Sequence, residues 1–124
     1  MTVKIYLRSI VKNGEKHLAM FDTNRNGDID NLTTVVPRGE NVIWKLDCCS
    51  GIKSITKIYS KNKERKVFKS DPTKLLLCKG FQVQISESAK PGEEETYAIE
   101  YLLRNGTKVV IDPCIRIDPP GISK

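Results

Sequence analysis

Apolar and polar residues alternate with a period of two along most of this 124-residue chain. Successive side chains of a β-strand point to opposite faces, so the pattern is typical of strands that bury one face. The clearest run spans residues 81–85, and a second run aligns four side chains on one face: Tyr97, Ile99, Tyr101 and Leu103. No stretch keeps a 3.6-residue period over ten residues or more, so we expect little helix.

Short turn signals separate these runs. Asn13-Gly14 and Asn105-Gly106 are strong hairpin signals, because both residue types tolerate positive φ. Pro37, Gly39, Gly51 and Pro72 mark further breaks. Many short strands at roughly even spacing predict an all-β sandwich or barrel, because two facing sheets can bury the alternating faces that one sheet would leave exposed.

The length fits one domain, which we place at residues 1–118, with a flexible C-terminal tail at 119–124. The apolar runs, among them 75–78 and 109–111, are far shorter than the ~20 residues of a membrane-spanning helix. Lys4 and Arg8 interrupt the N-terminal apolar pattern, so it lacks the continuous apolar core of a secretory signal. We therefore expect a cytoplasmic protein.

Two segments carry a family resemblance. The segment TVVPRGENVIWKLD (34–47), with Trp44 facing inward, looks like the early strand pair of cupredoxin-like Greek-key sandwiches. The segment YAIEYLLRNGTKVVIDPCIRI (97–117) is similar to their closing strands, and immunoglobulin-like sandwiches are an equal alternative. Both resemblances imply a Greek-key β-sandwich. A copper site would need two imidazoles, and His17 is the only histidine, so copper binding is not expected.

The loop at 22–33 raises the question of calcium. Its oxygen-bearing residues follow the order of an EF-hand-type loop, with Gly27 at the expected turn position: Asp22, Asn24, Asn26, Asp28 and Asp30. The twelfth position, where a bidentate carboxylate normally completes the site, holds Thr33. Asn and Asp also crowd β-turns without any ion. A plain loop is the preferred interpretation, and a calcium-stabilised module is the alternative.

The chain has a net charge of +6, and the segment 45–79 alone carries +7. Within the basic segment Lys53–Lys69, five cations could contact phosphates or other anions: Lys61, Lys63, Arg65, Lys66 and Lys69. Tyr59 and Phe68 could stack on bases, but we expect both to face the core. Solvated lysine is the preferred interpretation, and weak anion or nucleic-acid binding is the second alternative.

Catalysis has little support in the sequence. His17 is the single imidazole, and on an alternating strand we expect it to be exposed or at an edge. Glu93, Glu94 and Glu95 follow a Pro-Gly turn and are interpreted as solvated. The four cysteines (Cys48, Cys49, Cys78 and Cys114) lack the paired spacing of a zinc site and are expected to be free thiols.

These observations favour a non-catalytic binding or assembly module without a bound cofactor. A sandwich can hold a partner protein, or a second copy of itself, at its loops or strand edges. The segments Lys4–Lys12 and Lys108–Ile117 are long and β-prone, so we expect self-association through them. A proline at Ile5 or Ile115 would then reduce the size of the assembly.

Overall fold

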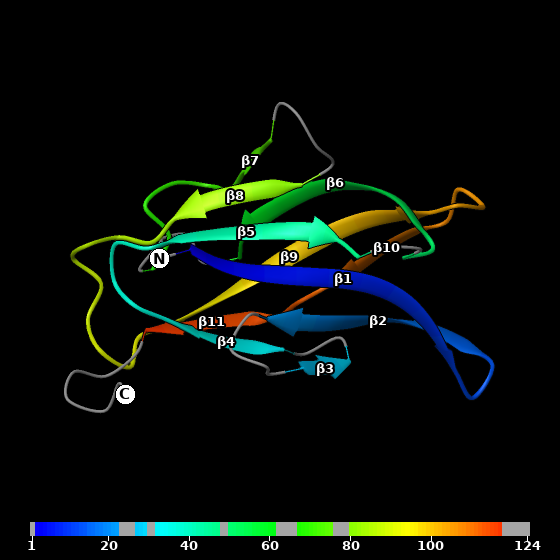
Figure 1. Ribbon diagram of the computed structural model, residues 1–124, viewed down its shortest axis with the longest axis horizontal. Helices are drawn as coiled ribbons and strands as arrows, with labels where there is room; N and C mark the ends of the chain where they lie inside the picture. The colour runs from blue at the N-terminus through cyan, green and yellow to red at the C-terminus, as the bar shows by residue number, and fades with distance from the viewer. Residues whose placement is uncertain are drawn as a thin grey trace.

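The computed structural model describes residues 2–22, 27–29, 32–47, 50–61, 67–75 and 80–117. Every regular element in these ranges is a β-strand (Figure 1), which confirms the all-β prediction. The strands are β1 (Thr2–Lys12), β2 (Glu15–Asp22), β3 (Gly27–Ile29), β4 (Thr33–Val36), β5 (Asn41–Leu46), β6 (Ile52–Ser60), β7 (Thr73–Lys74), β8 (Phe81–Gln84), β9 (Glu94–Leu103), β10 (Lys108–Ile111) and β11 (Cys114–Ile117). The described residues include no helix long and apolar enough to cross a bilayer.

The first sheet has six strands in the order β3-β2-β1-β5-β8-β7. Its two central strands are β1 and β5, and β1 pairs antiparallel with β2 and parallel with β5. The Asn13-Gly14 hairpin between β1 and β2 is confirmed, because both residues have positive φ, 53° and 79°. The sheet is therefore mixed, with a local hairpin on one side of β1 and a long-range parallel pair on the other.

The second sheet has the order β10-β9-β11-β4, and β6 also pairs with β9. Here β11 is antiparallel to β9 and parallel to β4, so this sheet is mixed as well. The predicted hairpin at Asn105-Gly106 does join β9 to β10, but only Gly106 has positive φ. The Leu103 amide donates a hydrogen bond to the Thr107 carbonyl at 2.9 Å. This bond closes the hairpin around residues 104–106, so the loop is longer than the two residues predicted.

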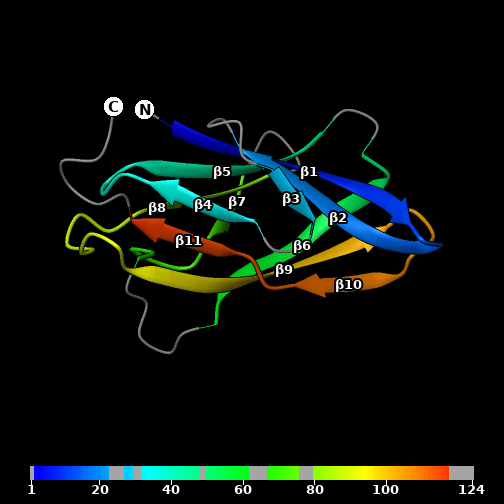
Figure 2. The same ribbon diagram turned by 90° about the horizontal axis from the view of Figure 1, so that it is seen from below.

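The two sheets form two layers (Figures 1 and 2), with β1 and β5 in one and β9 and β10 in the other. The predicted inward sets are confirmed on both sides of the core. Buried side chains from the first sheet include Val3, Ile5, Leu7, Val42, Trp44, Phe81 and Val83, and those from the second include Tyr97, Ile99, Tyr101 and Leu103. Alternation therefore identified which face of each strand is buried.

An aromatic cluster joins the layers at the centre of the core. The Trp44 ring lies 5.3 Å from the Tyr97 ring and 6.2 Å from the Phe68 ring, in edge-on arrangements. Trp44 Nε1 donates a hydrogen bond to the Tyr97 hydroxyl at 3.1 Å. Burial raises the pKa of Tyr97 far above its usual range, although the bond from Trp44 opposes that shift. Tyr97 is therefore a neutral acceptor at any physiological pH.

We expect Tyr97→Phe to lower the free energy of unfolding by about 1–3 kcal/mol, because Trp44 Nε1 would remain buried without its acceptor. Urea denaturation followed by circular dichroism measures the change. Tyr6→Phe is the matched control, since Tyr6 is only half-buried on the outer face of β1. Equal stability of the two variants would contradict the role given to the Trp44–Tyr97 bond.

The prediction that Glu95 is solvated is wrong. Glu95 is fully buried and faces the core from β9. Its Oε1 accepts hydrogen bonds from the backbone amides of Val67, at 2.8 Å, and Phe68, at 3.0 Å. Phe68 forms a bridge with Ile85, which directly follows β8 in the first sheet. Glu95 therefore ties the two layers together where the chain crosses between them.

Candidate binding surfaces

Ile5 and Ile115 do not lie on sheet edges, so the positions chosen to test association through Lys4–Lys12 and Lys108–Ile117 are wrong. Ile5 lies on β1, which has β2 on one side and β5 on the other. Ile115 lies on β11, which has β9 and β4 as its two neighbours. Both side chains are fully buried. A proline at either position would break a sheet ladder and the core, so it could not report on association.

The strand β10 does offer a free edge, since its one partner within the described residues is β9. Val110 on this strand is 48% exposed, and Val109 is partly buried against the core. Charged residues flank the two valines: Lys108 Nζ lies 3.1 Å from Glu100 Oε1, and Asp112 Oδ1 lies 3.3 Å from Lys61 Nζ. The edge thus has an apolar centre with an ion pair at each end, to which β10 contributes Lys108 and the residue after it contributes Asp112.

Glu100 lies beside this edge, directly opposite Val110 on β9. The hydrogen bond from Lys108 lowers the pKa of Glu100, while partial desolvation acts in the opposite direction. Because this pKa is lowered in the folded state, the ion pair stabilises the hairpin above the ordinary carboxyl pKa and is lost as the pH falls through the lowered one. Glu100 is therefore ionised at neutral pH.

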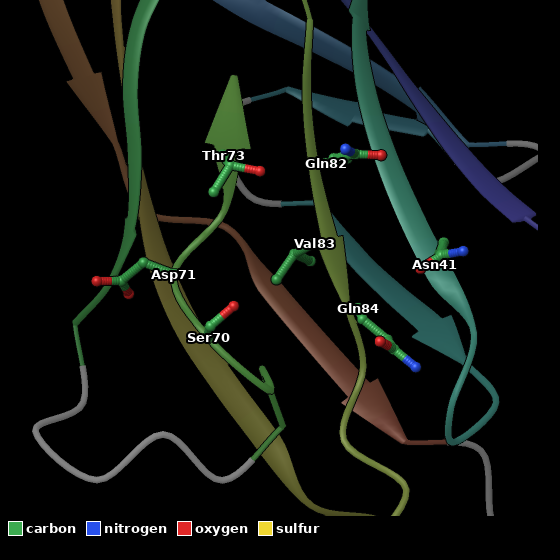
Figure 3. Close-up of a pocket in the computed structure, with 7 residues that line it drawn as sticks. All are labelled: Asn41, Ser70, Asp71, Thr73, Gln82, Val83 and Gln84. Atoms are coloured by element: carbon green, nitrogen blue, oxygen red, sulfur yellow. The ribbon is translucent and has the colours of Figure 1, made fainter. Parts of the chain in front are cut away.

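A polar hollow of about 230 Å³ opens beside β8 (Figure 3). It is lined mainly by amide and hydroxyl side chains: Asn41, Ser70, Asp71, Thr73, Gln82 and Gln84, together with Val83. The Lys69 amide bonds the Gln84 carbonyl at 2.9 Å, and β7 rejoins β8 at Thr73, so residues 70–72 arch over the gap between these contacts. The hollow can hydrogen-bond a small polar solute, although most of its side chains are exposed.

The candidate calcium ligands are only partly within the described residues. Asn24, Asn26 and Asp30 lie outside them, and Asp28 lies on β3. The Asp22 side chain is buried at the end of β2. Gly27 begins β3, where it pairs with Phe21, instead of forming the expected sharp turn. No group of three potential metal-binding side chains occurs among residues with described placement.

The candidate anion-binding residues are divided in the same way. Lys63, Arg65 and Lys66 lie outside the described residues, while Lys61 pairs with Asp112 and Lys69 lines a hollow with Ser86, Glu87 and Ser88. Phe68 is buried, as predicted. Tyr59 is only half-buried, and the Lys57 ammonium lies 4.7 Å from its ring centre, so its expected core position is wrong.

The groups considered for catalysis lie apart from these surfaces. His17 is partly exposed on β2, and its Nε2 lies 3.9 Å from a Glu15 carboxylate oxygen. Cys114 is a free thiol on β11, with its Sγ 3.4 Å from Thr96 Oγ1. Cys48, Cys49 and Cys78 lie outside the described residues.

Sequence reasoning missed two of the residues that matter here. Glu95 shares the parity of Tyr97 and Ile99, so extending that alternation by one step would have placed it inside. Phe21 is 47% exposed, and it shares the parity of His17 on β2, so the same alternation would have placed it outside.

Comparison with known proteins gives a likeness at the level of architecture. No family model matches the chain, and no curated protein matches it in sequence. Among solved structures, the chain is similar to the inclusion body protein PixA from Burkholderia cenocepacia J2315, with a TM-score of 0.52 and 13% identity. The match covers 94% of this chain and 95% of the other. That likeness concerns the fold alone. It extends over both sheets, so the two-layer all-β architecture is shared as a whole.

Proposed function

We propose that this protein is a non-catalytic assembly module of the Greek-key sandwich class, which acts in the cytoplasm and associates with a second copy of itself along β10. The observation that supports this proposal is the free edge of β10, where Val110 is 48% exposed. Edge strands expose unpaired backbone groups that template pairing with another strand. Short strands and lysines usually prevent such pairing, but here the exposed valine favours it.

The edge is suited to pairing with itself. If β10 of one copy lies antiparallel to β10 of another with Val110 near the two-fold axis, Lys108 of each copy lies opposite Asp112 of the other. These residues are two positions on either side of Val110, so the charges complement each other at both ends. Isologous pairing of this kind closes at a dimer and extends the second sheet across both copies.

Four residues of strand make a small interface, so we expect a weak dimer that forms at high protein concentration. The name of the structurally similar PixA, an inclusion body protein, is in keeping with an assembly role for the fold. The support for the present proposal comes from the edge itself.

The test is Val110→Lys. At the two-fold axis this change places two ammonium groups against each other and removes the apolar contact, so we expect dissociation to monomers. Analytical ultracentrifugation over a concentration series measures the dimer constant, and we expect at least a tenfold loss. Val11→Lys is the matched control. Val11 is 67% exposed at the tip of the β1–β2 hairpin in the first sheet, whereas β10 belongs to the second sheet.

The proposal fails if the wild-type protein remains monomeric at the highest soluble concentration. It also fails if Val110→Lys and Val11→Lys weaken a dimer equally, because that result would indicate general charge repulsion. Circular dichroism of both variants checks that the fold is kept.

A further inference from the structure

The two glutamines of the chain, Gln82 and Gln84, lie on the same strand, β8. Phe81, Val83 and Ile85 alternate with them and are buried, so both glutamines face outward from the first sheet. The outward positions of β1 and β9 include charged side chains, whereas those of β8 hold neutral amides alone. This strand therefore presents hydrogen-bonding groups without charge.

Neighbouring strands add further amide and hydroxyl groups beside these glutamines (Figure 3). Asn41 on β5 is directly opposite Gln84, and Thr73 on β7 is directly opposite Gln82. All four residues line the polar hollow of about 230 Å³. The other residues that line it are Ser70, Asp71 and Val83. The hollow is therefore built on three adjacent strands of one sheet, β5, β8 and β7.

The segment 70–72, which arches over this hollow, is held in place from both sides. Before it, the Lys69 amide donates a hydrogen bond to the Gln84 carbonyl at 2.9 Å. After Asp71, Pro72 is buried, and its ring fixes the backbone φ. Asp71 Oδ1 also accepts a hydrogen bond from the Ser60 amide at 3.5 Å. The rim is therefore largely formed before a ligand binds, which reduces the ordering cost of binding.

The lining of the hollow has many donors and acceptors but little charge. A glutamine or asparagine amide donates through its nitrogen and accepts through its oxygen, and a hydroxyl group does both at one atom. Asp71 is the one charged residue among the described residues that line the hollow. An anion such as phosphate would meet this carboxylate with no lining cation to offset it. A cation would in turn leave the NH₂ donors of the amides unused. The lining therefore favours a neutral ligand with several hydroxyl groups.

We propose that this hollow binds one ring of a neutral carbohydrate. A sugar ring presents hydroxyl groups on adjacent carbon atoms, and each of them donates one hydrogen bond and accepts others. The amides of Asn41, Gln82 and Gln84 can serve both roles, and the Asp71 carboxylate accepts from a further hydroxyl. The volume lies below the ~300–1,000 Å³ of sites for drug-sized ligands, so it suits a single ring. Since β8 belongs to the first sheet and β10 to the second, this binding does not depend on the proposed dimer.

The experiment is a titration of isotope-labelled wild-type protein with methyl glucoside, methyl galactoside and methyl mannoside, followed by nuclear magnetic resonance. The side-chain NH₂ groups of the two glutamines are observed directly, and Gln82→Met and Gln84→Met assign their signals. We expect saturable shifts of both signals with at least one of the three sugars, at millimolar concentrations because water competes for every hydrogen bond. The free sugars are titrated in parallel. They distinguish a free monosaccharide from a unit of a glycan chain, since the methyl group stands at the position of the glycosidic link.

Gln82→Met keeps the length of the side chain but removes its amide. We expect it to weaken binding about fivefold or more, the effect of losing one typical hydrogen bond. Lys53→Met is the matched control, because it places the same side chain at an exposed position of β6 in the second sheet. Circular dichroism of both variants checks that the fold is kept.

The proposal is overturned if none of the sugars shifts the glutamine NH₂ signals in a saturable way. It is also overturned if glycerol, at the same concentration of hydroxyl groups, has an equal effect, because glycerol lacks a ring. Tighter binding of inorganic phosphate, or equal affinity of Gln82→Met and Lys53→Met for the sugar, would overturn it as well. The titration of wild-type protein decides the question even if a variant folds poorly.

Discussion

Replacing Glu95 with alanine is expected to lower the free energy of unfolding by about 2–4 kcal/mol, because the buried amides of Val67 and Phe68 would lose their acceptor. Glu95→Gln retains the Oε1 acceptor, so we expect it to remain within about 1 kcal/mol of wild type. Urea denaturation monitored by circular dichroism measures both variants.

Glu94→Ala provides the control for this experiment. Glu94 is the preceding residue on β9, but it is half-exposed and makes only a surface pair with Arg116. Its loss should change stability little. If Glu95→Gln were as damaging as Glu95→Ala, the charge of the carboxylate would matter more than its acceptor, and the role assigned to it here would be wrong.

Trp44→Ala is expected to cost about 3–5 kcal/mol, since it removes the largest fully buried side chain and leaves a cavity between the sheets. A loss of that size is a large share of the 5–15 kcal/mol typical of a folded domain. The aromatic contacts of Phe68 and Tyr97 would be lost at the same time. Trp44 is the only tryptophan, so unfolding of the variant must be followed by circular dichroism instead of fluorescence.

Phe21→Ala is the control, because it also removes an aromatic side chain, but from the outer face. We expect a loss of about 1 kcal/mol or less at this exposed position. In the wild-type protein, Trp44 fluorescence should shift to longer wavelength on unfolding, as the indole passes from the core to water. A wild-type emission already typical of exposed indole would contradict the position of Trp44.

The sequence allowed the strand faces to be predicted, because burial follows a period of two that is visible in the residues themselves. Trp44, Val83 and Tyr101 were each placed correctly on the core side. The Asn13-Gly14 turn was also predictable, since its chemistry is local. The pairing of β1 with β5 was not, because a parallel pair joins residues about forty positions apart and leaves no local signal.

That missing pairing explains why Ile5 was wrongly expected at a sheet edge. A long β-prone segment such as Lys4–Lys12 has the same composition whether it lies at the centre or the rim of a sheet. Which side chains share one face of a sheet depends even more on register. Phe21, Tyr6 and Lys45 are far apart in the chain, and only the two ladders on either side of β1 bring them into one row. Glu95 had a visible parity, but its charge argued for solvent.

The insertion of β11 between β9 and β4 has a consequence for biosynthesis. Until residues 114–117 leave the ribosome, β4 lacks the neighbour it has in the finished sheet, and so does the first part of β9. The second layer can therefore close only after β11 has emerged, whereas the β1–β2 hairpin can form as soon as its own residues emerge. Until then the nascent chain should expose its half-built core, a period in which chaperone contact matters most.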